Sequence, residues 1–260
     1  GESNVLTLGT GTYYVKETKV PPGFALDTQI YEVTLKAGEK EPQVLTVSDV
    51  PVMNSVDLLL QKKDAETNQN SPQGKAGFEG AHFEVSYYKG LFNEDPALSG
   101  RKAERTWTLM TDEKGECRLN DRYFVSGDAF YQSSSGQPAF PLGTVTIRET
   151  QAPEGYLLNP DVYVVRIAGD NTGSESVQSY NAPEIPENIL KLKILKVIKD
   201  MEQTVPGAVF RHTLPDGSAE QVTTDQNGEA VLKGLTWGEH VIEEVSIPEG
   251  IVRNPGRVTF

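Results

Sequence analysis

The sequence is poor in the residues that mark several large classes of protein. It has one cysteine, Cys117, which excludes an internal disulfide framework and leaves the cellular compartment open. No apolar run approaches the length of a membrane helix, and no signal peptide is present. Lysine and arginine number 24 against 37 acidic residues, and the resulting net charge of −13 argues against nucleic acid and anionic membrane surfaces as partners.

Helical periodicity is scarce, and short alternating strands take its place. Clusters of Gly, Pro, Asn and Asp separate these strands, and 24 glycines and 16 prolines supply the turns. The pattern predicts an all-β protein built of sandwiches. The chain starts without Met and stops inside an apparent strand, so we expect an excerpt of a longer protein, in which missing targeting signals mean little.

Three sequence patterns recur along the chain. The first is Gly, then Glu, Pro and Gly at fixed spacing, and it occurs at Gly11-Glu17-Pro21-Gly23, Gly143-Glu149-Pro153-Gly155 and Gly238-Glu244-Pro248-Gly250. The second is Thr-Asp-x-x-Gly, at Thr111-Asp112-Gly115 and Thr224-Asp225-Gly228. The third is an apolar strand with a lysine, followed by Gly-Ala-x-Phe, at Lys62 with Gly80-Ala81-Phe83 and at Lys196 with Gly207-Ala208-Phe210.

The order of these patterns predicts one whole domain between two partial ones. Residues 54–184 carry the full set, with two aromatic-rich insertions at 86–105 and 120–142. Residues 1–53 carry the second half only, and residues 185–260 lack a closing strand. Pro183 and Pro186 are expected to form a short stiff junction between the second and third units.

Three kinds of polar residue fall by alternation on the apolar faces of these strands. Glu149 shares a face with Val145 and Ile147, where an unpaired carboxylate is costly. The other members are lysines after strands rich in leucine, and Asn or Asp near the unit ends. The full set is Lys62, Glu149 and Asn181 in the middle unit, Glu17 and Asp49 in the first, and Lys196 and Glu244 in the third.

Any one of these polar residues could lie at a strand end, where its side chain reaches water at the rim of the sandwich. That explanation does not account for the same three residue types at matching positions of repeated units. A desolvated lysine has its pKa lowered and becomes a neutral amine nucleophile. A buried glutamic acid has its pKa raised and can polarise a carbonyl and pass a proton to the leaving group. Attack on Asn releases ammonia, attack on Asp releases water, and either leaves an amide between two side chains.

The stretches KETKVPPGF and RETQAPEGY, with the lysine pattern, resemble the collagen-adhesin B-type (CnaB) domains of Gram-positive surface proteins and pilins. The resemblance covers essentially the whole chain. It implies tandem immunoglobulin-like β-sandwiches, one complete and two partial, that form internal Lys–Asn or Lys–Asp isopeptide bonds assisted by Glu. By position it implies a bond from Lys62 to Asn181 assisted by Glu149.

The partial units are expected to hold parts of the same set. The first has Glu17 and Asp49, with its lysine upstream of Gly1, and the third has Lys196 and Glu244, with its acceptor beyond Phe260. Asn254 is not that acceptor, because Asn254-Pro255 matches Asn159-Pro160. In the third unit Glu243 is an alternative register to Glu244, with His240 sharing the inward face of Glu244.

The function implied is a stalk of a secreted, cell-wall-anchored surface adhesin or pilin in a Gram-positive bacterium, with neighbouring repeat domains as partners. No cofactor, metal or membrane span is expected, and catalysis is limited to a single autocatalytic turnover. The alternative is a ligand-binding adhesin module that presents the insertion aromatics to host extracellular matrix or glycans. A turnover enzyme is disfavoured, because the three histidines have no metal-ligand spacing and no G-x-S-x-G motif is present.

Overall fold

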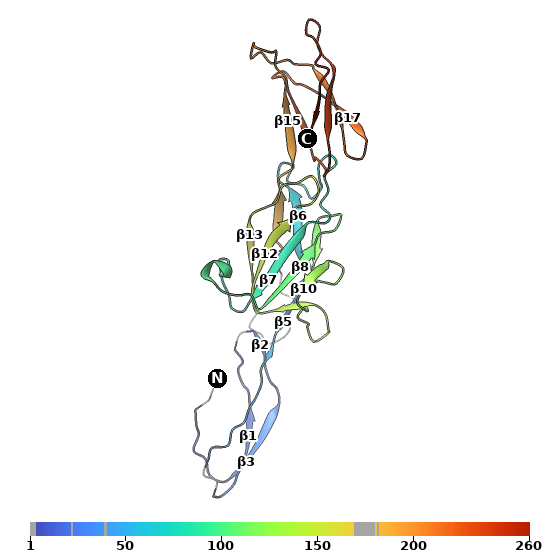
Figure 1. The fold of residues 1–260 in the computed structure, drawn as a ribbon. Coiled ribbons are helices and arrows are strands. Elements are labelled where there is room, and N and C mark those ends of the chain that lie inside the picture. Colours follow the sequence, from blue (N-terminus) through green and yellow to red (C-terminus); the bar gives the residue numbers. More distant parts are fainter. Residues whose placement is uncertain (1–3, 22, 39–40, 169–179, 181) are drawn as a thin grey trace.

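The computed structural model describes residues 4–21, 23–38, 41–168, 180 and 182–260. The chain forms an elongated rod of three units placed end to end, with the first and third units at opposite ends (Figure 1). Its described elements are strands apart from one 3₁₀ turn, η1 (Pro96–Ser99). No helix in the described ranges is long and apolar enough to cross a membrane. The all-β prediction is confirmed.

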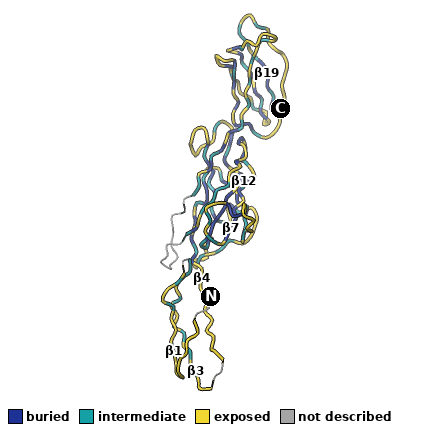
Figure 2. The backbone as a smooth tube through the Cα atoms, turned by 90° about the vertical axis from the view of Figure 1, so that its left-hand side faces the viewer, coloured by how far each residue is buried: buried dark blue, intermediate teal, exposed yellow. Residues whose placement is uncertain are grey.

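The first unit consists of two small antiparallel ribbons. Strand β1 (Gly11–Lys16) pairs with β3 (Ile30–Leu35), and β2 (Phe24–Ala25) pairs with β4 (Val50–Pro51). Most of this unit is exposed along its length (Figure 2). Tyr13 and Glu17 are half-buried as the alternation predicts, whereas Val15 on the same face is exposed, because no second sheet covers the ribbon.

The middle unit is a sandwich of two sheets. One has the strand order β10-β8-β7-β12-β13 and the other β14-β6-β9, with a β11-β5 ribbon beside them. The strands are β5 (Met53–Ser55), β6 (Leu58–Asp64), β7 (His82–Tyr88), β8 (Arg105–Met110), β9 (Glu116–Arg118), β10 (Phe124–Gly127), β11 (Ala139–Pro141), β12 (Gly143–Gln151), β13 (Val162–Ile167) and β14 (Glu184–Glu187).

The core of the middle unit takes one face from each sheet. Leu60 of β6 and Phe83, Trp107 and Ile147 of the larger sheet are fully buried in it. Six aromatics of the two insertions also belong to this core: Tyr87, Tyr123 and Phe140 are buried, and Phe124, Phe130 and Tyr131 pack against the cluster. These side chains stabilise the sandwich and do not form an exposed binding face.

Strand β14 runs parallel to β6 at the edge of its sheet, with Ile185 opposite Lys62. Pro186 is tolerated there because an edge strand needs hydrogen bonds on one side only. The strand carries the middle sheet past residue 184, where the sequence analysis ends the middle unit. The two prolines that predict a stiff linker therefore flank or belong to a strand of the sandwich.

The third unit repeats the plan with fewer strands. Strand β15 (Lys191–Leu195) pairs with β18 (Glu229–Lys233), and a second sheet has the order β17-β16-β19-β20. Its strands are β16 (Val209–Thr213), β17 (Ala219–Thr223), β19 (Val241–Ser246) and β20 (Arg257–Thr259). Its small core centres on Phe210, Leu232 and Ile242.

The Thr-Asp-x-x-Gly motif forms the same turn in both units. Asp112 Oδ1 accepts hydrogen bonds from two backbone N–H groups of the turn, and Asp225 Oδ1 does the same in the third unit. Gly115 has a φ of 72°, and a Cβ there would lie 3.0 Å from the Cβ of Lys62. Its carbonyl accepts the Lys62 N–H at 2.8 Å, so the turn fixes the backbone of the lysine strand.

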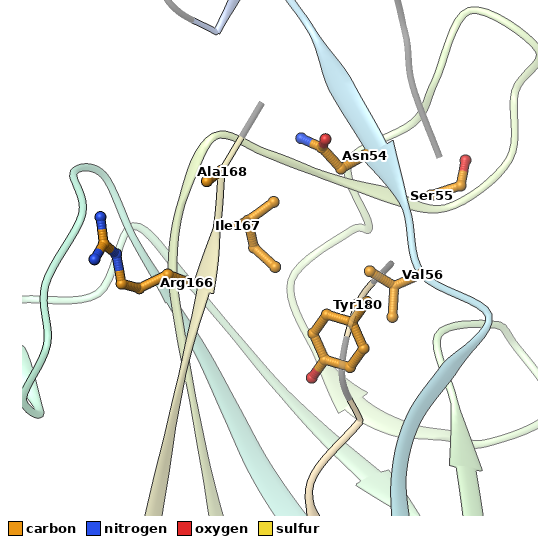
Figure 3. Close-up of a pocket in the computed structure, with 7 residues that line it drawn as sticks. All are labelled: Asn54, Ser55, Val56, Arg166, Ile167, Ala168 and Tyr180. Atoms are coloured by element: carbon orange, nitrogen blue, oxygen red, sulfur yellow. The ribbon is translucent and has the colours of Figure 1, made fainter. Parts of the chain in front are cut away.

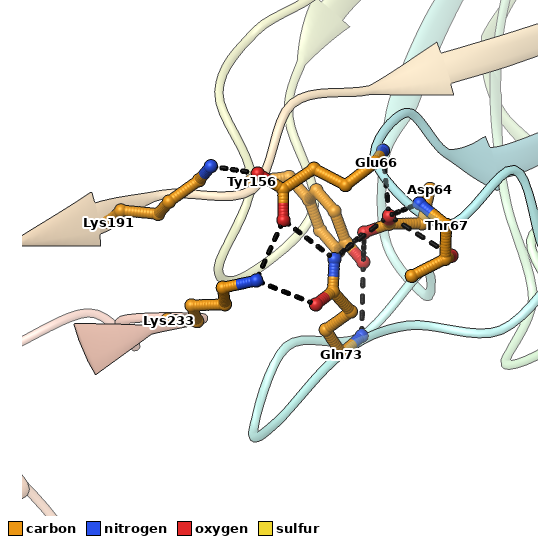
Figure 4. A network of polar contacts seen from close by, with 7 residues as sticks. All are labelled: Asp64, Glu66, Thr67, Gln73, Tyr156, Lys191 and Lys233. Atoms are coloured by element: carbon orange, nitrogen blue, oxygen red, sulfur yellow. Dashed lines mark hydrogen bonds and ion pairs between the residues drawn. The ribbon is translucent and has the colours of Figure 1, made fainter. Parts of the chain in front are cut away.

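A polar cluster joins the middle and third units (Figure 4). Glu66, in the loop after β6, contacts Lys191 of β15 and lies 2.9 Å from the Nζ of Lys233 in β18. The side-chain amide of Gln73 donates to both carboxylate oxygens of Asp64 and to Glu66. These hydrogen bonds hold Glu66, and through it the two lysines, against the loop. Trp237 N–H donates to Glu154 at 3.1 Å on the same junction. The contacts connect the two units directly as well as through the chain.

The junction has a predicted pH dependence. Two hydrogen bonds, the larger contribution from Lys191 and the next from Lys233, lower the pKa of Glu66 to about 2. A lowered pKa in the folded state means that the contact stabilises the junction above the unfolded value of about 4.3 and is lost as pH falls toward 2. A carbon-13 titration of the Glu66 carboxyl should therefore show a midpoint near 2, rising toward the ordinary value in Lys191→Met/Lys233→Met. An ordinary midpoint in the wild-type chain would contradict this junction.

Candidate functional site

The candidate site is built around the amino group of Lys62, which lies inside the middle sandwich. The side chain enters from β6, and its exposure is 0%. Lys62 Nζ also lies 4.9 Å from the ring centre of Phe83 in the facing sheet. The neighbouring Lys63 points outward and pairs with Glu184, as the alternation predicts. A lysine held in this way has lost its hydration and depends entirely on protein groups.

Glu149 provides the first of two carboxylates at this amine. Its Oε1 accepts a hydrogen bond from Lys62 Nζ at 2.6 Å, across from β12 to β6. Its Oε2 accepts the backbone N–H of Asn159 at 2.6 Å. Both oxygens are therefore held, and the residue is 4% exposed. The sequence prediction that Glu149 faces the core beside Lys62 agrees with this placement.

Glu187 provides the second carboxylate, and the sequence analysis did not anticipate it. Its Oε1 contacts Lys62 Nζ directly, and its exposure is 0%. Burial raises the pKa of Glu187 to about 7, opposed by the charge of Lys62 and reinforced by that of Glu149. Alternation from the buried Ile185 places Glu187 on the same inward face, but Pro186 between them predicts a linker instead of a strand.

The residue that anchors each glutamate recurs in all three units. Ten residues after the glutamate, a backbone N–H donates to its Oε2: Asp27 to Glu17, Asn159 to Glu149, and Asn254 to Glu244. In each case the Asx side chain accepts the N–H two residues further on, which forms an Asx turn. This fixed ten-residue spacing of Glu and Asx is a further sequence signal for the glutamate of each unit.

The third unit holds the same lysine–glutamate pair without a second carboxylate. Lys196 Nζ lies 2.9 Å from Glu244 Oε1, and the two side chains are 17% and 2% exposed. Glu244 faces inward, whereas Glu243 pairs with Arg257 at the surface, so the Glu244 register holds. Among the described residues, no other carboxylate contacts Lys196.

The structure describes one of the two predicted acceptors. Asp49 is exposed in the first unit, and Glu17 there accepts the backbone N–H of Asp27. Asn181 lies outside the described residues. Two described residues near it form hydrogen bonds with the part of β6 that precedes Lys62. The Tyr180 hydroxyl donates to the Leu59 carbonyl, and the Pro183 carbonyl accepts the backbone N–H of Gln61.

Other candidate sites in the described parts offer less chemistry. A small pocket is lined by Asn54, Ser55, Val56, Arg166, Ile167, Ala168 and Tyr180 (Figure 3). The Arg166 guanidinium points away from it and donates to Asn93 at 3.1 Å. His212 and His240, far apart in the sequence, stack with a 2.8 Å contact between Nε2 and Nδ1. The described residues include no group of three or more His, Cys, Asp or Glu that could bind a metal.

The Lys62 site can therefore perform one kind of chemistry without added components. An amine, a carboxyl in contact with it and a second carboxyl able to move protons are the parts of an amide-forming reaction. Each of the three groups is fully or almost fully buried and is therefore shielded from water.

Comparison with known proteins identifies relatives of the chain as a whole. A family model described as SpaA, prealbumin-like fold domain, matches residues 1–49, 57–182 and 190–260. The Bacillus anthracis TIE protein is 21% identical, with a TM-score of 0.52 over 97% of this chain and 39% of that chain. A streptococcal ancillary pilin is 19% identical, with a TM-score of 0.29 over 97% and 71% of the two chains.

A C-terminal fragment of the pilus adhesin SpaC from Lactobacillus rhamnosus GG is 16% identical, with a TM-score of 0.41 over 79% and 80% of the two chains. No curated protein sequence matches this chain. At these identities the Bacillus anthracis structure supports the fold alone, and this chain spans about two fifths of its length.

Proposed function

Because the chain belongs to the SpaA family of prealbumin-like fold domains, we propose that it is part of the stalk of a bacterial surface adhesin or pilin. The family predicted from the repeated motifs is the family found. In this proposal the units act as spacers on the outside of a Gram-positive cell, with other repeat domains or pilin subunits as partners. Autocatalytic isopeptide bonds stabilise them, and the described residues need no cofactor for that reaction.

The observation that carries the proposal is the fully buried Lys62 amine in contact with Glu149. A buried ion pair alone is a weak source of stability, because desolvation offsets the attraction between the charges. Condensation of the lysine with a neighbouring carboxyl or carboxamide removes that cost and joins the first strand of the sandwich to its last. A spacer under tension gains most from such a bond, since strands joined covalently do not separate.

The intact mass of the 260-residue chain tests this proposal. We expect it to fall below the sequence mass by one small molecule, and Glu149→Ala to restore the full mass while the chain stays folded by circular dichroism. Lys196→Met is the matched control, because it removes a similar lysine and should leave the mass deficit unchanged. A folded wild-type chain of full mass would overturn the proposed function.

A further inference from the structure

The Lys62 site has two carboxyl groups with different surroundings. Both oxygens of Glu149 accept hydrogen bonds, one from Lys62 Nζ and one from the Asn159 N–H. Glu187 Oε1 contacts Lys62 Nζ, whereas its Oε2 is buried and has no hydrogen-bond partner among the described residues. A buried carboxylate oxygen without a donor is costly, and loss of that oxygen as water would relieve the cost. Glu187 therefore suits the role of acceptor and Glu149 that of proton carrier.

The register of β14 brings Glu187, in particular, to the lysine. Residues 184–187 pair with residues 61–64 of β6, and Ile185 lies opposite Lys62. Inward-facing positions alternate, so Ile185 fills the core beside the lysine stem and Glu187 reaches its amino group. Among the described residues of this segment, those level with Lys62 thus belong to β14.

Asn159 connects the two carboxylates through the backbone. Its N–H holds Glu149, and its Nδ2 donates to the carbonyl of Pro186 at 2.9 Å, one residue before Glu187. Asn159 is 5% exposed, and its Nδ2 also lies 3.2 Å from the Tyr163 hydroxyl. One buried side chain thereby sets the position of the loop that anchors Glu149 and of the strand that carries Glu187, as a two-carboxyl reaction requires.

We propose that Glu187 is the acceptor of the isopeptide bond, so that the middle unit forms a Lys62–Glu187 amide. This inference rests on the proposed function and names its bonding partner. In the reaction, a proton passes from the Lys62 ammonium to Glu149, and the neutral Nζ attacks Cδ of Glu187. The bond between Nζ and Cδ forms, and the attacking nitrogen gives up a second proton. One C–O bond breaks, and the departing oxygen receives this proton together with the one held by Glu149. One ammonium and one carboxylate become one amide and one water.

The state of Glu187 and the contents of the site favour this step. Burial that raises the pKa of Glu187 to about 7 increases the fraction of acid at neutral pH, and a carboxylic acid accepts a nucleophile more readily than a carboxylate. The condensation also removes a buried cation and a buried anion together, which lowers the desolvation cost of the folded chain. The third unit provides an internal comparison, since its Lys196 meets a single glutamate.

Variants of the full chain distinguish Glu187 from Asn181. We expect the wild-type chain to lack one water and Asn181→Ala to lack the same. Glu187→Gln should keep the cross-link but lose ammonia in place of water, because glutamine presents a carboxamide at the same atom. Glu187→Ala should have its full mass. Tandem mass spectrometry of a tryptic digest should identify a branched peptide that joins Lys62 to Glu187.

Two results would overturn the assignment in different ways. A wild-type chain that lacks ammonia, with the deficit abolished by Asn181→Ala and kept in Glu187→Ala, would retain the isopeptide bond and remove Glu187 as its acceptor. A wild-type chain of full mass would remove the bond itself and with it the proposed function. If Glu187→Ala does not fold, the branched peptide of the wild-type chain and the change of leaving group in Glu187→Gln decide the question.

Discussion

Glu149→Gln is expected to lower the free energy of unfolding of the middle unit by about 4–5 kcal/mol, the model-dependent entropy of closing a loop of this size. Lys62 and Glu187 are 125 residues apart in the chain, so a bond between them closes almost the whole sandwich. Glutamine keeps the volume of Glu149 and an oxygen for the Asn159 N–H, but it has no acidic proton to carry. The variant is therefore expected to fold without the bond.

Denaturant unfolding of the two chains side by side measures this difference. Glu84→Gln on β7 is the control, because Glu84 is exposed on the outer face of the sheet and the substitution changes the same chemical group outside the core. Equal midpoints for wild type and Glu149→Gln, with a mass deficit in the wild type alone, would show that the bond forms and contributes little to stability.

Lys62→Met is expected to be more damaging than Glu149→Gln at pH 7. It prevents the bond and also leaves Glu149 and Glu187 buried without a cation, an imbalance that costs roughly 3–5 kcal/mol in other proteins. Methionine fills most of the volume of the lysine stem, so the effect reports charge more than packing.

The pH dependence of Lys62→Met identifies that cause. The folded pKa of Glu187 is already raised to about 7, and loss of Lys62, whose charge opposes the rise, raises it further. The folded state then binds more protons at Glu187 than the unfolded state does, so stability falls as pH rises, by up to about 1.4 kcal/mol per pH unit for this carboxyl. We expect the deficit of Lys62→Met to shrink between pH 7 and pH 5. A deficit that is constant over this range would point to packing instead.

The alternation of polar and apolar residues predicted most of the site. Glu149 and Lys62 each follow apolar residues at a spacing of two. Because every second side chain of a strand points to the same face, both must point inward with those apolar residues. The same rule placed Glu244 inward with Glu243 as an alternative register, and the structure has Glu244 inward. Each of these predictions depends only on the order of residues within one strand, and the sequence gives that order completely.

The other features of the site and the fold depend on how the strands are arranged around one another, which the sequence of a single strand does not specify. Glu187 follows a proline, and proline in a strand is tolerated only at a sheet edge, a property of the assembled fold. The exposure of Asp49 and Val15 likewise reflects what covers the first unit, not their own spacing. The insertion aromatics could be assigned to the core only when the sheets that they fill were known.

The parallel pairing of β14 with β6 also sets the order in which the middle unit is completed. A chain that emerges from its N-terminus presents β6 early, while the partner strand is the last of the sandwich to appear. Contacts between residues so distant in the chain form slowly. Until β14 pairs with β6, Glu187 is not in contact with Lys62 and the proposed bond between them cannot form. The chain can therefore still unfold and pass through a narrow channel. With the proposed Lys62–Glu187 bond, docking of the final strand would convert a reversible fold into a permanent one.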